Sequence, residues 1–337
     1  MKGVFRFTIV LFFGLILLEF GLRVTGHTPF QLPVGGIESN PKGCFIPQMN
    51  KGIVLAPGKF TVNIGELTYE TRHTLDSMRS TSLNLIQDSI TKPIVQLYGC
   101  SFTYGMGVND EETYPWLLQE RFRLLKVENR GVPGYGQVQL LNELRDNKMS
   151  FEGVKVIVLN YLPFHDERNT LNAAFRHKLN IGYQLSKKQD PELLTDFSYP
   201  YAAIDGGALQ LDQLEMKDIE RSFFWESNSA LLHILFNGLR DLRVDAKHDF
   251  RVTTQLIKEI KAACDSRKIE LILTLMLDDQ RSYDLIDYCQ SIGVNTQDVS
   301  IDLNDKQMTN YPYDQHPSPK AHQIIADKLS PYFQQLL

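Results

Sequence analysis

The stretch IVQLYGCSFTYG, residues 94–105, decides the fold because it joins a short apolar strand to a tight turn. Two further apolar runs follow it, Val154–Tyr161 (VKVIVLNY) and Ile269–Met276 (IELILTLM). Amphipathic segments with helical spacing lie around these runs, at Thr113–Lys126, Gln137–Asp146, Val252–Ala263, Arg281–Ser291 and Ser318–Phe333. Buried strands that alternate with helices predict an α/β fold whose parallel sheet is covered by helices on both faces.

Ser101 follows the first of these strands, at the end where a parallel α/β sheet binds its ligands. A serine on a tight strand-to-helix turn is held out of the sheet, and backbone N–H groups of the turn can face a developing oxyanion. Thr103 stands where a G-x-S-x-G motif has its second glycine, which disfavours the nucleophile elbow of α/β-hydrolases. Taken alone, the segment could also be a Gly/Ser turn without chemistry.

Asp314 and His316 come just before the last predicted helix, for which Ser318 is the expected N-cap. A nucleophilic serine needs a base to take its proton, and the base needs a partner that holds its tautomer. Side chains two residues apart in an extended segment point to the same side, so Asp314 could orient His316 toward Ser101. A surface loop with an Asp–His hydrogen bond is the alternative. His322 is a competing base, which we expect to be packed or to cap the helix.

The N-terminus has the pattern of a membrane-targeting segment. Lys2 and Arg6 precede an uncharged apolar run, Phe7–Leu18, as in the n-region and h-region of a secretory signal. Because no A-x-A-like cleavage site follows, we expect residues 1–23 to be an uncleaved signal anchor. A cleaved signal peptide and a buried core helix are the alternatives. The positive-inside rule places Lys2 and Arg6 in the cytoplasm and the chain after Arg23 outside.

The rest of the chain divides into a small N-terminal region and a large domain. Residues 24–60 are rich in Gly, Pro and Asn and predict a tether with irregular structure, and strand-like runs follow at Thr61–Ile64 and Leu67–Arg72, so that 24–92 forms a small β-rich region. The main domain spans 93–337. The alternation of strands and helices stops at about 167–250, where we expect an insertion over the strand ends, with a hairpin at Tyr199–Leu211 and a helix near Ser229–Leu242.

The composition limits the classes of protein to which the chain can belong. Its 337 residues are 43% hydrophobic and 22% charged, which is typical of a globular protein that buries a core without disulfides. The net charge of −5 excludes nucleic-acid binding through overall basicity, and we expect no nucleic-acid partner. No C-x-x-C pair occurs among the four cysteines, which disfavours a zinc site, while a disulfide between Cys264 and Cys289 stays open.

In combination, the motifs resemble the SGNH (GDSL-type) serine hydrolase superfamily over roughly residues 93–335. The resemblance rests on four blocks, Gly99–Gly105, Asn129–Gly136, His165-Asp166 and Asp314–Pro317, and the anchored N-terminus looks like that of membrane-tethered bacterial members. It implies a three-layer, flavodoxin-like α/β/α fold with Ser101 as nucleophile, His316 as general base and Asp314 as its partner. It also implies an oxyanion hole made by the backbone N–H groups of Ser101 and Gly134 and by a side chain of the third block.

Three positions depart from the family pattern. Cys100 stands where the first block usually has Asp, and we expect it to pack under the sheet edge. His165 occupies the slot of the usual third-block Asn, and a histidine N–H can also donate to an oxyanion, with Asn160 as the alternative donor. The last block is Asp-x-His where Asp-x-x-His is commoner, which affects the role of Asp314 more than that of His316.

These observations predict an extracytoplasmic serine esterase that hydrolyses or transfers an acyl group, foremost acetyl, on a glycan or another envelope component. The aromatic residues of the insertion could stack on sugar rings or pack in the core; they are Tyr199, Tyr201, Phe223, Phe224 and Trp225. A catalytically silent glycan-binding or assembly module is the alternative function. A metal site could also be formed at the strand ends, by His165, Asp166, Asp314 and His316. These residues do not have the spacing of metal ligands on a helix, as in H-E-x-x-H, so we expect no metal and no cofactor.

Overall fold

The computed structural model describes residues 2–33, 35–83, 92–189, 192, 197–220 and 223–337. Five parallel strands form the central sheet in the order β12–β11–β8–β6–β7. Their bounds are β6 (Ile94–Gly99), β7 (Lys126–Gly131), β8 (Val154–Tyr161), β11 (Glu270–Leu275) and β12 (Asn295–Asp298). The expected parallel α/β sheet is confirmed.

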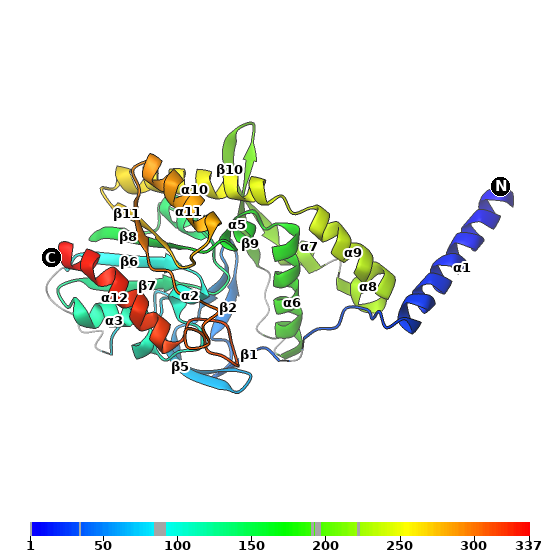
Figure 1. The fold of residues 1–337 in the computed structure, drawn as a ribbon, viewed down its shortest axis with the longest axis horizontal. Helices are drawn as coiled ribbons and strands as arrows, with labels where there is room; N and C mark the ends of the chain where they lie inside the picture. The colour runs from blue at the N-terminus through cyan, green and yellow to red at the C-terminus, as the bar shows by residue number, and fades with distance from the viewer. Residues whose placement is uncertain (1, 34, 84–91, 190–191, 193–196, 221–222) are drawn as a thin grey trace.

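Alternate side chains of each strand enter two separate cores. Val95 and Val156 face one core, which α3 (Tyr114–Arg121) and α12 (Pro319–Gln335) cover. Ile157 faces the other core, whose helices are α4 (Val138–Arg145), α10 (Ala246–Ser266) and α11 (Gln280–Ser291). Figure 1 shows α10 and α12 on opposite sides of the sheet, so the fold has the three layers expected from the sequence.

The N-terminal region packs against the segment that carries the candidate nucleophile. Strands β1 (Ile37–Asn40), β4 (Gly58–Ile64) and β5 (Leu67–His73) form an antiparallel sheet, and β2 (Phe45–Gln48) pairs with β3 (Gly52–Leu55). Val62 and Tyr69 share a buried cluster with Tyr104 and Met106. The part of 24–60 that runs from β1 into β4 is therefore more ordered than the expected tether, because side chains such as Leu55 and Phe60 are buried in the same cluster.

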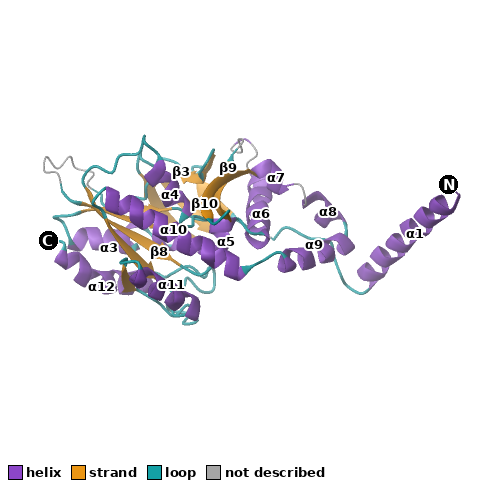
Figure 2. Cartoon of the chain, turned by 90° about the horizontal axis from the view of Figure 1, so that it is seen from above, coloured by secondary structure: helices purple, strands orange, loops and turns teal. Residues whose placement is uncertain are grey.

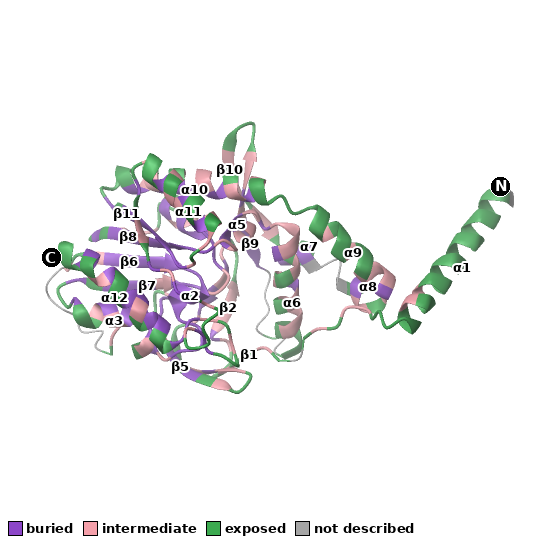
Figure 3. Ribbon diagram, in the orientation of Figure 1, coloured by how far each residue is buried: buried purple, intermediate pink, exposed green. Residues whose placement is uncertain are grey.

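The described residues of the insertion form α5 (His165–Thr170), α6 (Ala173–Gln189), β9 (Ser198–Asp205), β10 (Ala208–Glu215), α7 (Met216–Glu220), α8 (Phe223–Asn228) and α9 (Ala230–Leu242). The expected hairpin is β9–β10, and the expected helix is α9, which the Ser229 hydroxyl caps. Helix α1 (Lys2–Val24) extends away from the body in both views (Figures 1 and 2). Figure 3 shows α1 exposed along almost its whole length.

One sequence expectation about the secondary structure was wrong. The helix predicted over Thr113–Lys126 ends at Arg121, and Lys126 begins strand β7. This strand has the sequence KVENRG, which contains no apolar run. Its Glu128 can be buried because it is paired: Gln96 donates to Glu128 at 2.9 Å, and Arg130 bonds to the same carboxylate. Periodicity cannot detect a strand that is buried through hydrogen bonds.

All four cysteines lie in the described residues, and all are buried free thiols. Cys264 and Cys289 pack in the same core as separate thiols, so the disulfide that the sequence left open is not formed. Cys100 is fully buried at the end of β6, as expected.

Candidate active site

Ser101 begins α2 (Ser101–Tyr104), directly after β6 ends at Gly99. Glycine is required at position 99 because an added Cβ would collide with the Thr103 hydroxyl. Gly105 ends the helix in the left-handed region at φ 89°, and its N–H donates to the Ser101 carbonyl at 2.9 Å. The two glycines confine Ser101 to a tight turn at the carboxyl end of the sheet.

The loop that carries His316 is fixed to the same end of the sheet. Asn310 donates from its backbone N–H to the His316 carbonyl at 3.0 Å, and its amide group donates to the Met106 carbonyl at 3.4 Å. Ser318, after the loop, caps α12 by accepting from the Ala321 N–H, as the sequence predicted. The loop is thus held between the start of α12 and the segment that follows the nucleophile turn.

The structure brings Ser101, His316 and Asp314 together in one hydrogen-bonded chain. His316 Nε2 lies 2.9 Å from Ser101 Oγ, and His316 Nδ1 lies 2.7 Å from both carboxylate oxygens of Asp314. Asp314 Oδ1 also accepts the His316 backbone N–H at 3.2 Å, and this local turn lets an Asp-x-His spacing work. The carboxylate requires Nδ1 to carry the proton, which leaves Nε2 as the acceptor for the serine hydroxyl.

The electrostatics keep Asp314 ionised. Burial alone would raise the pKa of Asp314, but the hydrogen bond and charge of His316 outweigh it, and the pKa lies below its ordinary value. The Phe102 ring meets the His316 ring edge to face, with centroids 5.5 Å apart. Asp314 is therefore an anionic partner that orients the base and stabilises the imidazolium form.

Gly134 lies in the loop after β7, beside α2. Its φ is 86°, and a Cβ built on it would meet nothing within 4 Å. Val132 donates from its backbone N–H to the Gly99 carbonyl at 3.1 Å, which fixes this loop beside the nucleophile strand. Open space at Gly134 suits a backbone that a ligand approaches closely, although its oxyanion role remains a prediction.

His165 and Asn160, the two candidates for the third oxyanion donor, are both buried. The Nδ1 atom of His165 accepts from the Gln137 amide group at 2.9 Å and from the Leu162 N–H at 3.4 Å, so the proton resides on Nε2. Burial, together with the Arg168 charge, holds the pKa of His165 well below its ordinary value, so the ring is neutral. Its Nε2–H has no hydrogen-bond partner among the described residues.

Asn160 also keeps a spare donor. Its amide group donates one of its two N–H bonds to the Thr274 hydroxyl at 3.2 Å, and its Oδ1 has no partner within the described part of the chain. The choice of His165 as the third oxyanion donor, with Asn160 as the alternative, therefore stays a prediction.

Arg79 is a buried residue of the site region that no sequence pattern indicated. Its guanidinium bonds to Asp110 at 2.8 Å, to the Val108 carbonyl at 2.7 Å, and to the carbonyls of Tyr104 and Gly105 at the end of α2. The side chain is fully buried. Arg79 thus fixes the carbonyl end of the helix on which Ser101 is the first residue. Its partners lie about 25–31 positions away in the sequence, so no local pattern signals the contact.

His322 is packed and does not compete as a base. It is fully buried, stacks on the Tyr114 ring with centroids 5.8 Å apart, and accepts the Tyr114 backbone N–H. Burial lowers its pKa to about 3. Asp166 bonds to Thr253 at 2.7 Å and to Tyr161 at 3.1 Å, and the described residues include no group of three or more potential metal ligands.

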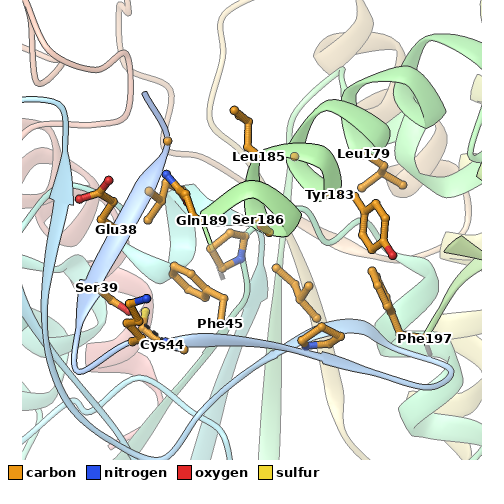
Figure 4. A pocket seen from close by; sticks show the side chains of 18 of the residues that line it. Glu38, Ser39, Cys44, Phe45, Leu179, Tyr183, Leu185, Ser186, Gln189 and Phe197 are labelled. Atoms are coloured by element: carbon orange, nitrogen blue, oxygen red, sulfur yellow. Dashed lines mark hydrogen bonds between the residues drawn. The ribbon is translucent and has the colours of Figure 1, made fainter. Parts of the chain in front are cut away.

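A cavity of about 620 Å³ opens between the N-terminal strands and α6. Figure 4 shows Glu38 and Phe45 of the N-terminal strands on one side of it and Tyr183 of α6 on the other. Aromatic and aliphatic side chains make up half of the lining residues, and six lining residues are polar or charged: Glu38, Ser39, Lys42, Lys178, Ser186 and Gln189. Pro133 also lines the cavity. Pro133 is the chain neighbour of Gly134, so the cavity reaches the loop that carries Gly134.

Comparison with solved structures finds hydrolases of the expected kind. A member of the lipolytic protein G-D-S-L family from Veillonella parvula is 10% identical, with a TM-score of 0.40, and the match covers 72% of this chain and 98% of that one. A carbohydrate esterase of family 3 from Talaromyces cellulolyticus is 12% identical, with a TM-score of 0.37, and the match covers 72% and 97%. A family two carbohydrate esterase from Clostridium thermocellum, in complex with cellohexaose, is 13% identical, with a TM-score of 0.37, and the match covers 72% and 64%.

No protein-family model matches the sequence, and no curated protein matches it. Among solved structures the chain is similar to G-D-S-L family proteins and carbohydrate esterases. Because the TM-scores and identities are low, the roles of the site residues depend on the geometry of Ser101, His316 and Asp314 in this chain.

Proposed function

We propose that the chain is a membrane-anchored, extracytoplasmic serine esterase that removes or transfers an acyl group, foremost acetyl, from an ester on a glycan or another envelope component. The observation that carries the proposal is the hydrogen-bonded chain from Ser101 Oγ through His316 to Asp314, at 2.9 and 2.7 Å. These distances are those of a nucleophile, its base and the partner of that base.

In the first half-reaction Ser101 Oγ attacks the ester carbonyl carbon while His316 Nε2 takes the hydroxyl proton. The negative charge that develops on the carbonyl oxygen is stabilised by the backbone N–H groups of Ser101 and Gly134 and by the His165 Nε2–H. The imidazolium of His316, stabilised by Asp314, then gives its proton to the departing alkoxide. An acyl-enzyme on Ser101 and a free alcohol result.

In the second half-reaction another hydroxyl compound attacks the acyl-enzyme. His316 takes a proton from the attacker as it adds to the acyl carbon, and returns that proton to Ser101 Oγ as the ester bond breaks. Water gives hydrolysis and a free acid, whereas a sugar hydroxyl gives transfer and a new ester. Comparing products with and without an acceptor glycan separates the two outcomes.

The cavity beside Pro133 is the candidate place for the bulk of the substrate. Its volume of about 620 Å³ exceeds the needs of an acetyl group, and its mixture of aromatic and polar side chains suits an organic ligand with hydroxyl groups. Gly182 of α6 lines the cavity and has open space around its Cβ position. Gly182→Leu should lower kcat/KM for an acylated oligosaccharide and leave p-nitrophenyl acetate unaffected.

Gly238→Leu is the matched control, because Gly238 is also a helical glycine with open space at its Cβ position but lies in α9. Equal effects of Gly182→Leu on the large and the small ester would contradict the placement of substrate in the cavity.

The localisation is proposed from α1. Residues Gly3–Val24 of this helix form a segment that is long and apolar enough to cross a membrane. Its most apolar 18 residues have a mean hydropathy of 2.1, and none of them is buried in the protein. The positive charges of Lys2 and Arg6 before the apolar run favour a cytoplasmic N-terminus and an extracytoplasmic body.

The direct test is hydrolysis of p-nitrophenyl acetate by the full-length chain and by Ser101→Ala. We expect turnover by the first and none by the second. Equal rates in the two proteins would refute the esterase proposal and favour the silent glycan-binding module.

A further inference from the structure

Helices α8 and α9 leave a band of large apolar side chains exposed beside the end of α1. The band, called here the α8–α9 apolar face, consists of Phe224, Trp225, Ile234, Leu235, Leu239 and Leu242. Trp225 is 55% exposed, and Leu242 is 84% exposed. Large apolar side chains exposed on two neighbouring helices mark a surface that meets an apolar partner.

The apolar face follows from the helical period of α9. Leu235, Leu239 and Leu242 are spaced i, i+4 and i+7 and share one side of the helix. The opposite side is polar and is attached to the protein: Arg240 bonds to Glu226 at 2.8 Å, and that carboxylate is 1% exposed. Helix α9 is therefore held to its neighbour α8 by its polar side and presents its apolar side outward.

The end of α1 is joined to the start of α9 by a set of specific hydrogen bonds. Glu19 of α1 accepts from the Ser229 hydroxyl at 2.8 Å and from the N–H groups of Ala230 and Leu231 at 3.0 and 2.9 Å. A carboxylate at this position caps the helix and complements its dipole. Arg23 of α1 donates to the carbonyl of Asn228 at 2.9 Å.

This junction determines where α9 lies. Glu19 and Arg23 are the charged residues at the end of the apolar run of α1, so they mark the boundary of the membrane that α1 crosses. Helix α9 begins at that boundary, and in Figure 1 its axis runs across the direction of α1. The exposed Arg243 and Lys247 follow α9 in the chain and suit the phosphates of lipid headgroups.

We infer that the α8–α9 apolar face is embedded in the headgroup layer of the same phospholipid bilayer that α1 crosses. The inference rests on the proposed anchoring by α1. The partner is a lipid surface because the face combines Trp and Phe side chains with an amphipathic helix at the end of a membrane span. The anchor and the interfacial helix then form one rigid unit, which holds the catalytic body close to the membrane.

The two tryptophans allow a direct test in the full-length chain reconstituted in phospholipid nanodiscs. Trp116 is buried in the body, whereas Trp225 lies on the apolar face. In the Trp116→Phe variant, phosphatidylcholine brominated near the headgroup end of its chains should quench the remaining fluorescence, and acrylamide in the water should quench it weakly. The Trp225→Phe variant is the control and should be insensitive to the brominated lipid.

Leu235→Glu combined with Leu239→Glu, in the Trp116→Phe background, should remove the lipid quenching and increase the acrylamide quenching. Leu124→Glu is the matched control, because Leu124 is an exposed leucine of the distant α3–β7 connection, and it should leave both unchanged. Quenching of Trp225 by acrylamide but not by brominated lipid would overturn the inference. Protection of Trp225 from both quenchers would also overturn it, since a second protein copy would then cover the face.

Hydrolysis of p-nitrophenyl acetate in the same nanodiscs separates this inference from the proposed function. Activity without lipid quenching contradicts the interfacial placement alone. Lipid quenching without activity contradicts the esterase alone.

Discussion

Substitution of Arg79 by lysine should destabilise the protein and slow the chemistry at Ser101. The guanidinium of Arg79 makes hydrogen bonds to Asp110 and to three carbonyls around the end of α2, all without access to water. A lysine ammonium carries its donors on one atom and can replace about half of these bonds. Each lost bond to a charged group costs about 1.5 kcal/mol or more, so the loss in the free energy of unfolding is about 3 kcal/mol.

The control for this substitution is Arg72→Lys. Arg72 contacts the same Asp110 carboxylate at 3.4 Å, but its side chain is 38% exposed, and we expect a loss below about 1 kcal/mol. The assay is urea unfolding of the full-length chain in detergent, followed by the fluorescence of the buried Trp116, together with kcat on p-nitrophenyl acetate. A loss for Arg79→Lys no larger than that for Arg72→Lys would refute the assignment of Arg79 as the residue that fixes α2.

Three further substitutions test the site. Asp314→Asn should lower kcat by about 10³- to 10⁴-fold, because the amide no longer stabilises the productive tautomer and the imidazolium form of His316, and kcat close to the wild-type value would exclude Asp314 as its partner. His165→Ala should lower kcat by about 10²- to 10³-fold with KM little changed, and a larger kcat effect for Asn160→Ala would reverse the assignment of the oxyanion donor. Asp166→Asn should remove a pH dependence of stability. Burial, partly offset by bonds from its hydroxyl neighbours, raises the pKa of Asp166 from 3.8 to about 6, so the stability that its protonated form contributes is full below pH 3.8 and is lost as the pH rises through 6. At about 1.4 kcal/mol per pH unit this amounts to about 3 kcal/mol in total. Urea unfolding at pH 5 and pH 8 captures about 1.4 kcal/mol of it, the part that is lost between pH 5 and pH 6, and an equal change with pH in the wild-type protein and Asp166→Asn would contradict the raised pKa.

Sequence patterns predicted the parts of the fold that depend on apolar periodicity. The run Val154–Tyr161 became β8 with the same bounds, and Ser318 became the N-cap of the last helix, because both signals are local. Strand β7 was missed because Glu128 is buried in it through polar pairing with the half-buried Arg130. A short segment of sequence does not show that a residue far away in the chain will pair with one of its charged side chains.

The proposed catalytic residues were predictable because their chemistry restricts both their types and their positions at strand ends. Ser101 and His316 are 215 positions apart, yet each follows from the strand or helix beside it. Arg79 and Gln137 were not predictable, since their roles come from contacts with backbone carbonyls and with His165 that exist only after folding. In the family pattern the Asp-x-x-His spacing is commoner than Asp-x-His, so the sequence alone left the role of Asp314 open. In the structure Asp314 accepts the His316 backbone N–H, and this turn lets the shorter spacing bring the carboxylate to the imidazole.

Labelling of the full-length chain with a fluorophosphonate, followed by mass spectrometry of its peptides, tests directly whether Ser101 and His316 act as nucleophile and base. We expect one modified residue, Ser101. We also expect a slower rate of labelling in His316→Ala, because this variant lacks the base that activates the Ser101 hydroxyl. Labelling of another serine, or equal labelling rates in the wild-type protein and His316→Ala, would contradict the claim that these two side chains act as nucleophile and base.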